Sequence, residues 1–249
     1  MLTCGIDLAA EPKKTAVAML RWHEAGATVE SVRLGADDAQ LLEAIAQADK
    51  TGIDCPLGWP RAFVEFVVQQ QDGAFTAPRD VAGSTWRVPL RFRKTDEFVR
   101  RQEGGRWPLS VSTDLIGVTA MRAVSLLADL AASGRPVDRT GRGAVAEVYP
   151  AAALRIWKIR HSGYKGTVNA GVLTDVFDSF AVAAPWLHFA DSTALCRRSD
   201  DAFDAVVAAV VARAAALGAV TWPGAEDESY AQTEGWILLP TCTLGDLGP

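Results

Sequence analysis

Residues 2–22, LTCGIDLAAEPKKTAVAMLRW, hold the pattern on which the fold prediction rests. Two apolar runs, at 2–8 and 15–22, flank the polar loop AAEPKK, and this arrangement is typical of a β-hairpin. A third strand is expected at 28–34, entered through a turn at Gly26. The chain therefore opens on three consecutive antiparallel strands.

The next segment predicts a helix and then a parallel strand. Asp37 or Asp38 is expected to cap a helix, and GIDCPLGWP at 52–60 predicts a short buried strand at 52–55 that Pro56 ends. Three antiparallel strands followed by a helical crossover to a parallel strand are a specific topology. We expect an α/β fold with a mixed five-stranded sheet, three antiparallel strands and then parallel ones, flanked by helices.

The remaining elements follow from periodicity and capping signals. They are helices at 60–71 and 114–132, a short helix capped by Thr95, a turn-rich basic stretch at 72–94, a strand at 144–150, a helix begun by Pro150, a helix within 167–181 and a last helix at 200–217 capped by Ser199. In the 114–132 helix, the expected buried side consists of Leu115, Val118, Met121, Ala123, Leu126, Leu127 and Leu130. We expect a single domain over 1–249, with an inserted helical subregion at about 60–135.

Composition places the chain among ordinary globular proteins. It has 249 residues, of which 49% are hydrophobic and 22% charged. No apolar run approaches the ~20 residues that span a bilayer, and the N-terminus lacks the basic region of a signal peptide. The four cysteines are far apart and form no CxxC motif. These features predict a cytoplasmic protein with no membrane partner, no disulfide framework and no structural zinc.

The charge distribution is uneven although the net charge is −5. Seven basic residues against three acidic ones lie between Arg87 and Arg106, and RIWKIRHSGYK at 155–165 carries four basic residues and no acid. These stretches are either solvated surfaces or a basic rim around an acidic site, which a phosphodiester substrate would favour. No P-loop, G-x-G-x-x-G or G-x-S-x-G motif occurs, so a nucleotide cofactor is not expected.

Four carboxylates fall where the pattern predicts burial. Asp7, Asp54 and Glu147 interrupt strands, and Asp204 lies inside the last helix beyond its first turn. Each has a local alternative, such as a bond to loop N–H groups, a turn cap, or for Glu147 an ion pair with Arg155 or Lys165. Buried ionised carboxylates are costly unless they are paired or bound to a cation. A shared divalent cation satisfies all of them at once.

The last helix carries the most informative of these acids. Asp204 shares a helix face with Asp201 and with the small residues Ala205, Ala208 and Ala212. Such a stripe of small side chains would let the helix approach the sheet closely. We therefore expect Asp204 to lie beside the acids of the strands.

An ordered series of segments resembles one protein family. The segments are GIDLAAEPKKTAVAML, GIDCPLGWP, RKTDEFV, AEVYPAAALR, GYKG, DDAFDAVVAAVVARA and EGWILLP, which together run from Gly5 to Pro240. They resemble the domain of unknown function 429 family, whose members are described as predicted RNase H-like nucleases. The acid in the first strand and the DxxDA of the last helix also look like the wider RNase H-like superfamily.

The resemblance implies an RNase H-like sheet and a site for Mg²⁺ or Mn²⁺. Asp7 corresponds to the acid of the first strand and Asp204 to that of the last helix, with Asp201 one turn earlier. The middle ligand is either Glu147 or Asp54. The implied function is hydrolysis of phosphodiester bonds of a nucleic acid, DNA or RNA, by a two-metal mechanism.

Side chains that could hold such a substrate follow from the basic and aromatic residues near these motifs. Arg93, Lys94 and Lys165 are candidates for orienting phosphate, and Tyr164 is a candidate for stacking on a base. Two other functions are consistent with the sequence. One is a non-catalytic binding or scaffold protein that keeps this fold, and the other is a phosphotransferase of the actin-like kind.

Overall fold

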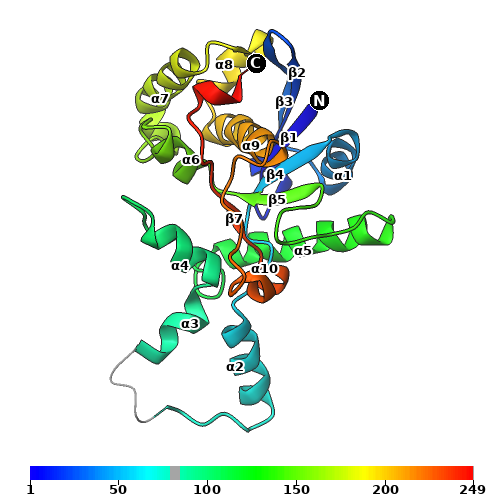
Figure 1. Ribbon diagram of the computed structural model, residues 1–249, viewed down its shortest axis with the longest axis vertical. Helices are drawn as coiled ribbons and strands as arrows, with labels where there is room; N and C mark the ends of the chain where they lie inside the picture. The colour runs from blue at the N-terminus through cyan, green and yellow to red at the C-terminus, as the bar shows by residue number, and fades with distance from the viewer. Residues whose placement is uncertain (79–84, 249) are drawn as a thin grey trace.

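A computed structural model describes residues 1–78 and 85–248 and shows a mixed α/β protein (Figure 1). Its sheet has the order β6-β3-β2-β1-β4-β5-β7. The strands are β1 (Leu2–Asp7), β2 (Ala16–His23), β3 (Gly26–Leu34), β4 (Lys50–Asp54), β5 (Val145–Val148), β6 (Leu187–His188) and β7 (Ile237–Leu238). The first three pair antiparallel, whereas β4, β5 and β7 follow parallel to β1.

The α/β class and the change from antiparallel to parallel strands are therefore confirmed, but the number of strands is wrong. Two additional strands, β6 and β7, extend the sheet at its two edges. Each has two residues, which is too short for an alternating pattern to reveal. Their pairing depends on the edges that β3 and β5 present to them.

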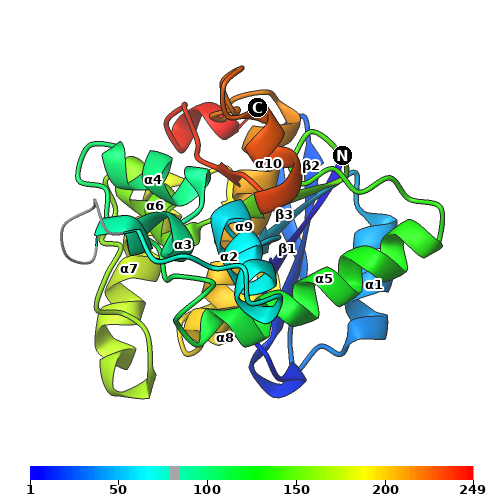
Figure 2. The same ribbon diagram turned by 90° about the horizontal axis from the view of Figure 1, so that it is seen from below.

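Helices surround this sheet and fill the connection between β4 and β5. They are α1 (Asp38–Gln47), α2 (Arg61–Gln71), α3 (Val88–Arg91), α4 (Lys94–Arg101), α5 (Ile116–Ala132), α6 (Pro150–Ile156), α7 (Ala170–Ala183), α8 (Thr193–Cys196), α9 (Asp200–Ala216) and α10 (Glu228–Glu234). In Figure 2, α6, α7 and α9 lie on one side of the strands, and α1 and α5 lie on the other. The two faces of the sheet thus have separate hydrophobic cores.

Several local predictions can be compared with the structure. Asp37 caps α1 and Ser199 caps α9, as expected. Thr95 does not cap α4, which begins after Arg93; its buried hydroxyl instead accepts a hydrogen bond from the Ile237 N–H at 2.7 Å. Thr95 therefore connects α4 to β7 through a tertiary hydrogen bond and does not cap the helix. The basic stretch 72–94 contains α3, and its residues 79–84 lie outside the described residues.

The first half of α5 is packed differently from the prediction. Leu115, Val118 and Met121 are exposed, at 91%, 56% and 64%. Ala123, Leu126, Leu127 and Leu130 are buried, as expected, and Thr119 and Ala120 continue this side toward the start of the helix. Helical spacing shows that a helix has an apolar side, but a helix that is apolar almost all round does not reveal which side meets the sheet.

Among the described residues, no helix is both long enough and apolar enough to cross a bilayer. The four cysteines are all free thiols, and Cys4, Cys55 and Cys196 are buried.

Helix α9 packs closely against the centre of the sheet because two strands present glycines to it. A Cβ on Gly5 would lie 1.9 Å from the backbone oxygen of Ala205, and a Cβ on Gly52 would lie 2.6 Å from that of Ala208. These distances are far below a van der Waals contact. The glycines of β1 and β4 and the alanines of α9 are therefore what bring this helix against the strands.

Gly5→Ala is expected to destabilise the fold by about 3 kcal/mol, because the added methyl group meets rigid backbone and overpacking of a core is costly. In a protein of this size that change corresponds to a fall in Tm of about 6–12 °C, which a thermal melt followed by circular dichroism would detect. Gly171→Ala is the matched control, since a Cβ at this helical position meets nothing within 4 Å. A Gly5→Ala protein as stable as this control would contradict the packing described.

Candidate functional site

Two identical tripeptides place two aspartates side by side at one end of the sheet. Gly5-Ile6-Asp7 in β1 and Gly52-Ile53-Asp54 in β4 pair in parallel register, so that Asp7 lies opposite Asp54. Side chains alternate along a strand, so each Asp projects from the same face as its Gly, the face covered by α9. The short loops after both strands begin at these carboxylates.

Asp204 of α9 faces this pair from the helix. It is fully buried, and the hydroxyl of Tyr164 donates a hydrogen bond to its Oδ1 at 2.8 Å. Its Oδ2 lies 2.7 Å from the ammonium Nζ of Lys165. The close packing of α9 on Gly5 and Gly52 thus brings a third carboxylate to the first two, as the alanine stripe predicted.

The three carboxylates, Asp7, Asp54 and Asp204, form an acidic cluster whose members influence one another. Burial raises the pKa of Asp54 to about 7, Lys165 opposes that rise, and the charge of Asp204 adds to it. Burial also raises the pKa of Asp7 well above its usual range, and Asp204 and Asp54 raise it further. Loss of solvation is thus the main physical cause, and repulsion between the carboxylates adds to it.

Lys165 is the cation that this cluster now holds. Burial of the amine by itself lowers the pKa of Lys165. The charges of Asp204, Asp54 and Asp7 outweigh this effect and raise that pKa above its usual value. The side chain is nevertheless 53% exposed, so its long stem enters the cluster from the solvent side. The exposed stem gives the ammonium a path into solvent, but its departure would leave the buried Asp204 carboxylate without a cation unless another one replaced it.

A cavity of about 320 Å³ opens onto the cluster. Its charged lining consists of Asp7, Asp54, Arg93, Glu147 and Lys165. The rest of the wall comes from loops after the strands, from the segment 108–116 and from β7. A cavity of this size is within the range of small-molecule and active sites.

Glu147 lies near the cluster but is neutralised separately. It pairs with Ile53 across β4 and β5, so it projects from the opposite face of the sheet to Asp54. Arg93 donates to both of its oxygens, at 2.7 and 2.8 Å, and the Leu57 N–H donates to Oε2 at 3.0 Å. Its partner is thus neither Arg155 nor Lys165, and the carboxylate is already satisfied.

Arg93 connects three parts of the fold. It is 2% exposed, and besides Glu147 it donates to both oxygens of Asp96 and to the backbone oxygen of Glu234. All five guanidinium N–H groups therefore have protein acceptors, and none is left for a phosphate. The structure gives Arg93 the role of joining α4, β5 and the end of α10.

The other predicted substrate residues have different surroundings. The ring of Tyr164 is 1% exposed, so it is not available to stack on a base. Lys94 is half-exposed at the start of α4, where its amine lies 3.5 Å from Glu97 and does not line the cavity. Asp201 lies one turn before Asp204 and is partly buried; burial raises its pKa, and Asp200 adds to that rise.

The donor atoms of the cluster suit a hard divalent cation, because Mg²⁺ and Mn²⁺ prefer carboxylate oxygens. Over the two described ranges, however, no three His, Cys, Asp or Glu side chains already surround a point that could hold a metal ion. The Lys165 amine lies at Asp204 instead. Metal binding at Asp7, Asp54 and Asp204 would require this amine to move, which its 53% exposure permits.

Sequence reasoning missed one residue of the cavity wall, Tyr149. It follows β5 directly and lines both the 320 Å³ cavity and a smaller neighbouring one. Its position after an acid-bearing strand, in EVYP, was the available signal.

A family model described as "Protein of unknown function (DUF429)" matches residues 5–228 of this chain. The match covers most of the sequence, and the chain therefore belongs to that family. No curated protein and no solved structure shows a significant match.

Asp54→Asn is expected to stabilise the protein in the presence of a metal chelator, and more so as the pH rises. The folded state holds the Asp54 proton up to a pKa of about 7, against 3.8 for the free side chain, so ionisation above pH 4 destabilises the fold progressively until about pH 7. The gain in Tm should be near zero at pH 4 and several degrees at pH 8.

Thermal melts of the wild type and Asp54→Asn at both pH values test this expectation. Asp72→Asn, an exposed aspartate at the end of α2, is the control and should show no such dependence. An equal gain at pH 4 and pH 8 would mean that the Asp54 carboxyl is not held in its neutral form.

Proposed function

We propose that this protein is a divalent-metal-dependent phosphodiester hydrolase that acts on a nucleic acid. One observation carries the proposal, namely the register of the two Gly-Ile-Asp tripeptides beneath α9. It sets Asp7 opposite Asp54 in the wall of an open cavity, and Asp204 of α9, far from both in sequence, lies beside them. Burial, and after it repulsion among the carboxylates, raises the pKa of Asp7 and Asp54, and such shifts are common at functional sites.

The fold supports the same proposal. Within the sheet, the order β3-β2-β1-β4-β5, with the first three strands antiparallel, is the arrangement expected of an RNase H-like protein. The acid of the first strand and the acid of the last long helix lie together, as the resemblance implies. We infer that the RNase H-like superfamily is the wider group to which the chain belongs.

We assign the middle ligand to Asp54 rather than to Glu147. Glu147 already accepts three hydrogen bonds from Arg93 and Leu57 and projects from the other face of the sheet. Asp54 stands opposite Asp7 and has its pKa raised by Asp204. The proposed ligand set is therefore Asp7, Asp54 and Asp204, with Asp201 one turn away.

In this mechanism the protein's own residues prepare the site. Tyr164 fixes the orientation of the Asp204 carboxylate through its 2.8 Å hydrogen bond. Lys165 neutralises the cluster in the free protein and, once displaced, is free to contact a substrate phosphate at the rim. Mg²⁺ or Mn²⁺ ions held there would supply an attacking hydroxide and stabilise the leaving oxygen.

The proposal is tested by measuring cleavage of single-stranded, duplex and branched DNA and RNA with Mn²⁺. Asp7→Asn and Asp204→Asn should each lower the rate by at least about 100-fold, more than the loss usual for residues outside the ligand shell. Asp200→Asn is the matched control, because Asp200 begins the same helix and is not one of the proposed ligands. Cleavage that persists in both ligand variants would refute the site.

One observation favours a second candidate, a non-catalytic binding protein with this fold. The 2.7 Å ion pair of Lys165 with Asp204 already gives the cluster a cation without any metal. In that case the lysine would be a structural partner of the three acids, and the cavity would bind a ligand without catalysing a reaction.

Lys165→Met separates the two candidates. With a chelator it should lower Tm, because three carboxylates lose their cation. If the site binds metal, Mn²⁺ should then raise Tm by more than it does in the wild type, since no amine competes. A melt that Mn²⁺ leaves unchanged in both proteins would favour the binding protein. Lys158→Met, an exposed lysine after α6, is the control.

A further inference from the structure

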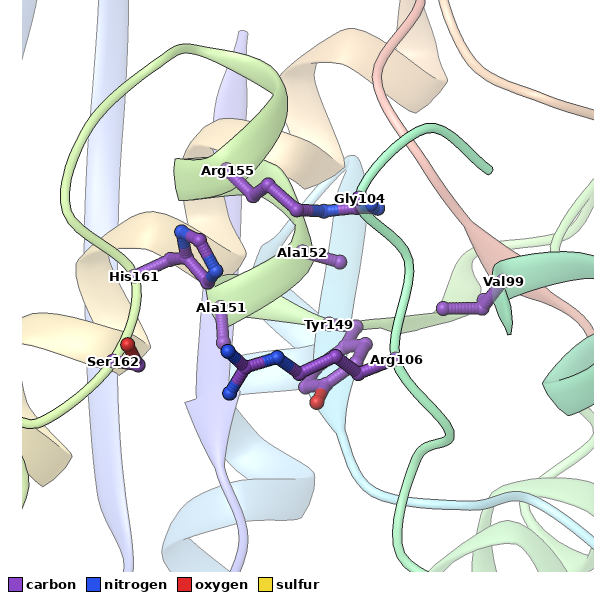
Figure 3. Close-up of a pocket in the computed structure, with 9 residues that line it drawn as sticks. All are labelled: Val99, Gly104, Arg106, Tyr149, Ala151, Ala152, Arg155, His161 and Ser162. Atoms are coloured by element: carbon purple, nitrogen blue, oxygen red, sulfur yellow. The ribbon is translucent and has the colours of Figure 1, made fainter. Parts of the chain in front are cut away.

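A small basic pocket adjoins the acidic cavity (Figure 3). It has a volume of about 130 Å³ and is lined by two segments that are distant in sequence, 99–106 and 149–162. Arg106 comes from the loop after α4, Arg155 from α6, and His161 from the loop that follows α6. The ends of the two basic stretches recognised in the sequence, Arg87–Arg106 and 155–165, thus meet here.

The pocket holds positive charge without a matching acid. No Asp or Glu lines it, and Arg106 is exposed and has no hydrogen-bond or ion-pair partner among the described residues. Arg155 donates through Nη1 to the backbone oxygen of Glu103. Its Nη2 is buried and has no acceptor within the described parts of the chain. A buried guanidinium N–H without an acceptor is costly, and an anion would satisfy it.

The lowered pKa of His161 is consistent with the same excess of positive charge. Burial lowers its pKa, and the charges of Arg155 and Arg106 lower it further. Burial and the two guanidinium groups thus disfavour the imidazolium form, although a backbone hydrogen bond to Ile159 opposes this effect. An anion in the pocket would reverse the balance and favour the imidazolium.

The pocket and the acidic cavity share a wall. Tyr149 and Ala151 line both of them. Burial raises the pKa of the Tyr149 hydroxyl, the charge of Asp54 adds to this, and Lys165, Arg155 and Arg106 oppose it. This ring therefore stands between the carboxylates on one side and the guanidinium groups on the other.

The volume limits what the pocket can hold. At about 130 Å³ it is smaller than the ~300–1,000 Å³ of ordinary small-molecule sites, so it suits one compact group and not a nucleoside. Two guanidinium groups and an imidazole are donors that match phosphate oxygens.

We propose that this pocket binds a phosphate group of the substrate, next to the phosphodiester that the acidic site hydrolyses. Phosphate binding by the pocket rests on its own geometry. That this phosphate belongs to a substrate hydrolysed at the acidic site rests on the proposed function. A substrate phosphate held by Arg106, Arg155 and His161 would place the neighbouring linkage beyond Tyr149, at the acidic cluster. The substrate class is therefore a nucleic acid strand or end that presents two consecutive phosphates.

The test is a titration of the full chain with inorganic phosphate, in chelator and at constant ionic strength, followed by NMR of the His161 imidazole. Phosphate should bind saturably and raise the His161 pKa. Arg106→Met and Arg155→Met should each weaken binding by about 10-fold or more, the loss of ~1.4 kcal/mol expected for one charge-assisted contact. Arg33→Met, an exposed arginine on β3, should bind as the wild type does.

Because Arg106 is exposed, its variant carries the test if Arg155→Met does not fold. Tetranucleotides with and without a 5′-phosphate then identify the source of the group: a preference for the phosphorylated one indicates a strand end, and equal affinity indicates an internal linkage. Phosphate binding that does not saturate would overturn the proposal. Arg106 and Arg155 variants that bind phosphate as tightly as the wild type would also overturn it. Intact phosphate binding without nuclease activity would instead overturn only the proposed function.

Discussion

The close approach of α9 to β1 and β4 is the constraint on which the rest of the site depends. Gly5 and Gly52 leave room for the backbone of this helix, and Ala205 and Ala208 are small enough to use it. A larger residue at any of these positions would push the helix outward, and Asp204 with it. The packing of small residues is thus what converts three separate acids into one cluster.

The buried acids of this protein are neutralised in two different ways. Glu147 and Asp96 share Arg93, an almost fully buried partner whose N–H groups are all bonded. Within residues 1–78 and 85–248, the cation paired with the cluster of Asp7, Asp54 and Asp204 is Lys165, which enters from solvent and is 53% exposed. The first arrangement is a fixed structural connection. The second is open to solvent on the side of its cation, which is why we propose that the chemistry takes place there.

Much of the fold was predictable from local pattern. The hairpin at the N-terminus, the crossover through α1 and the caps of Asp37 and Ser199 are short-range features, and they agree with the structure. The two-residue edge strands and the exposed side of α5 were not predictable. Their positions depend on which surfaces the assembled sheet offers, and a window of neighbouring residues contains no such information.

For the site, the sequence by itself determined that Asp7, Asp54, Glu147 and Asp204 would need partners, since ionised carboxylates inside apolar segments are otherwise too costly. Only the tertiary structure decided which residues are the partners of these carboxylates. Strand register set Asp54 opposite Asp7 and turned Glu147 to the other face, toward Arg93. The tertiary fold likewise brought Arg106, Arg155 and His161 together in one pocket. The physical reason is that burial is encoded locally, residue by residue, whereas the pairing of charges requires distances between parts of the chain that only folding sets.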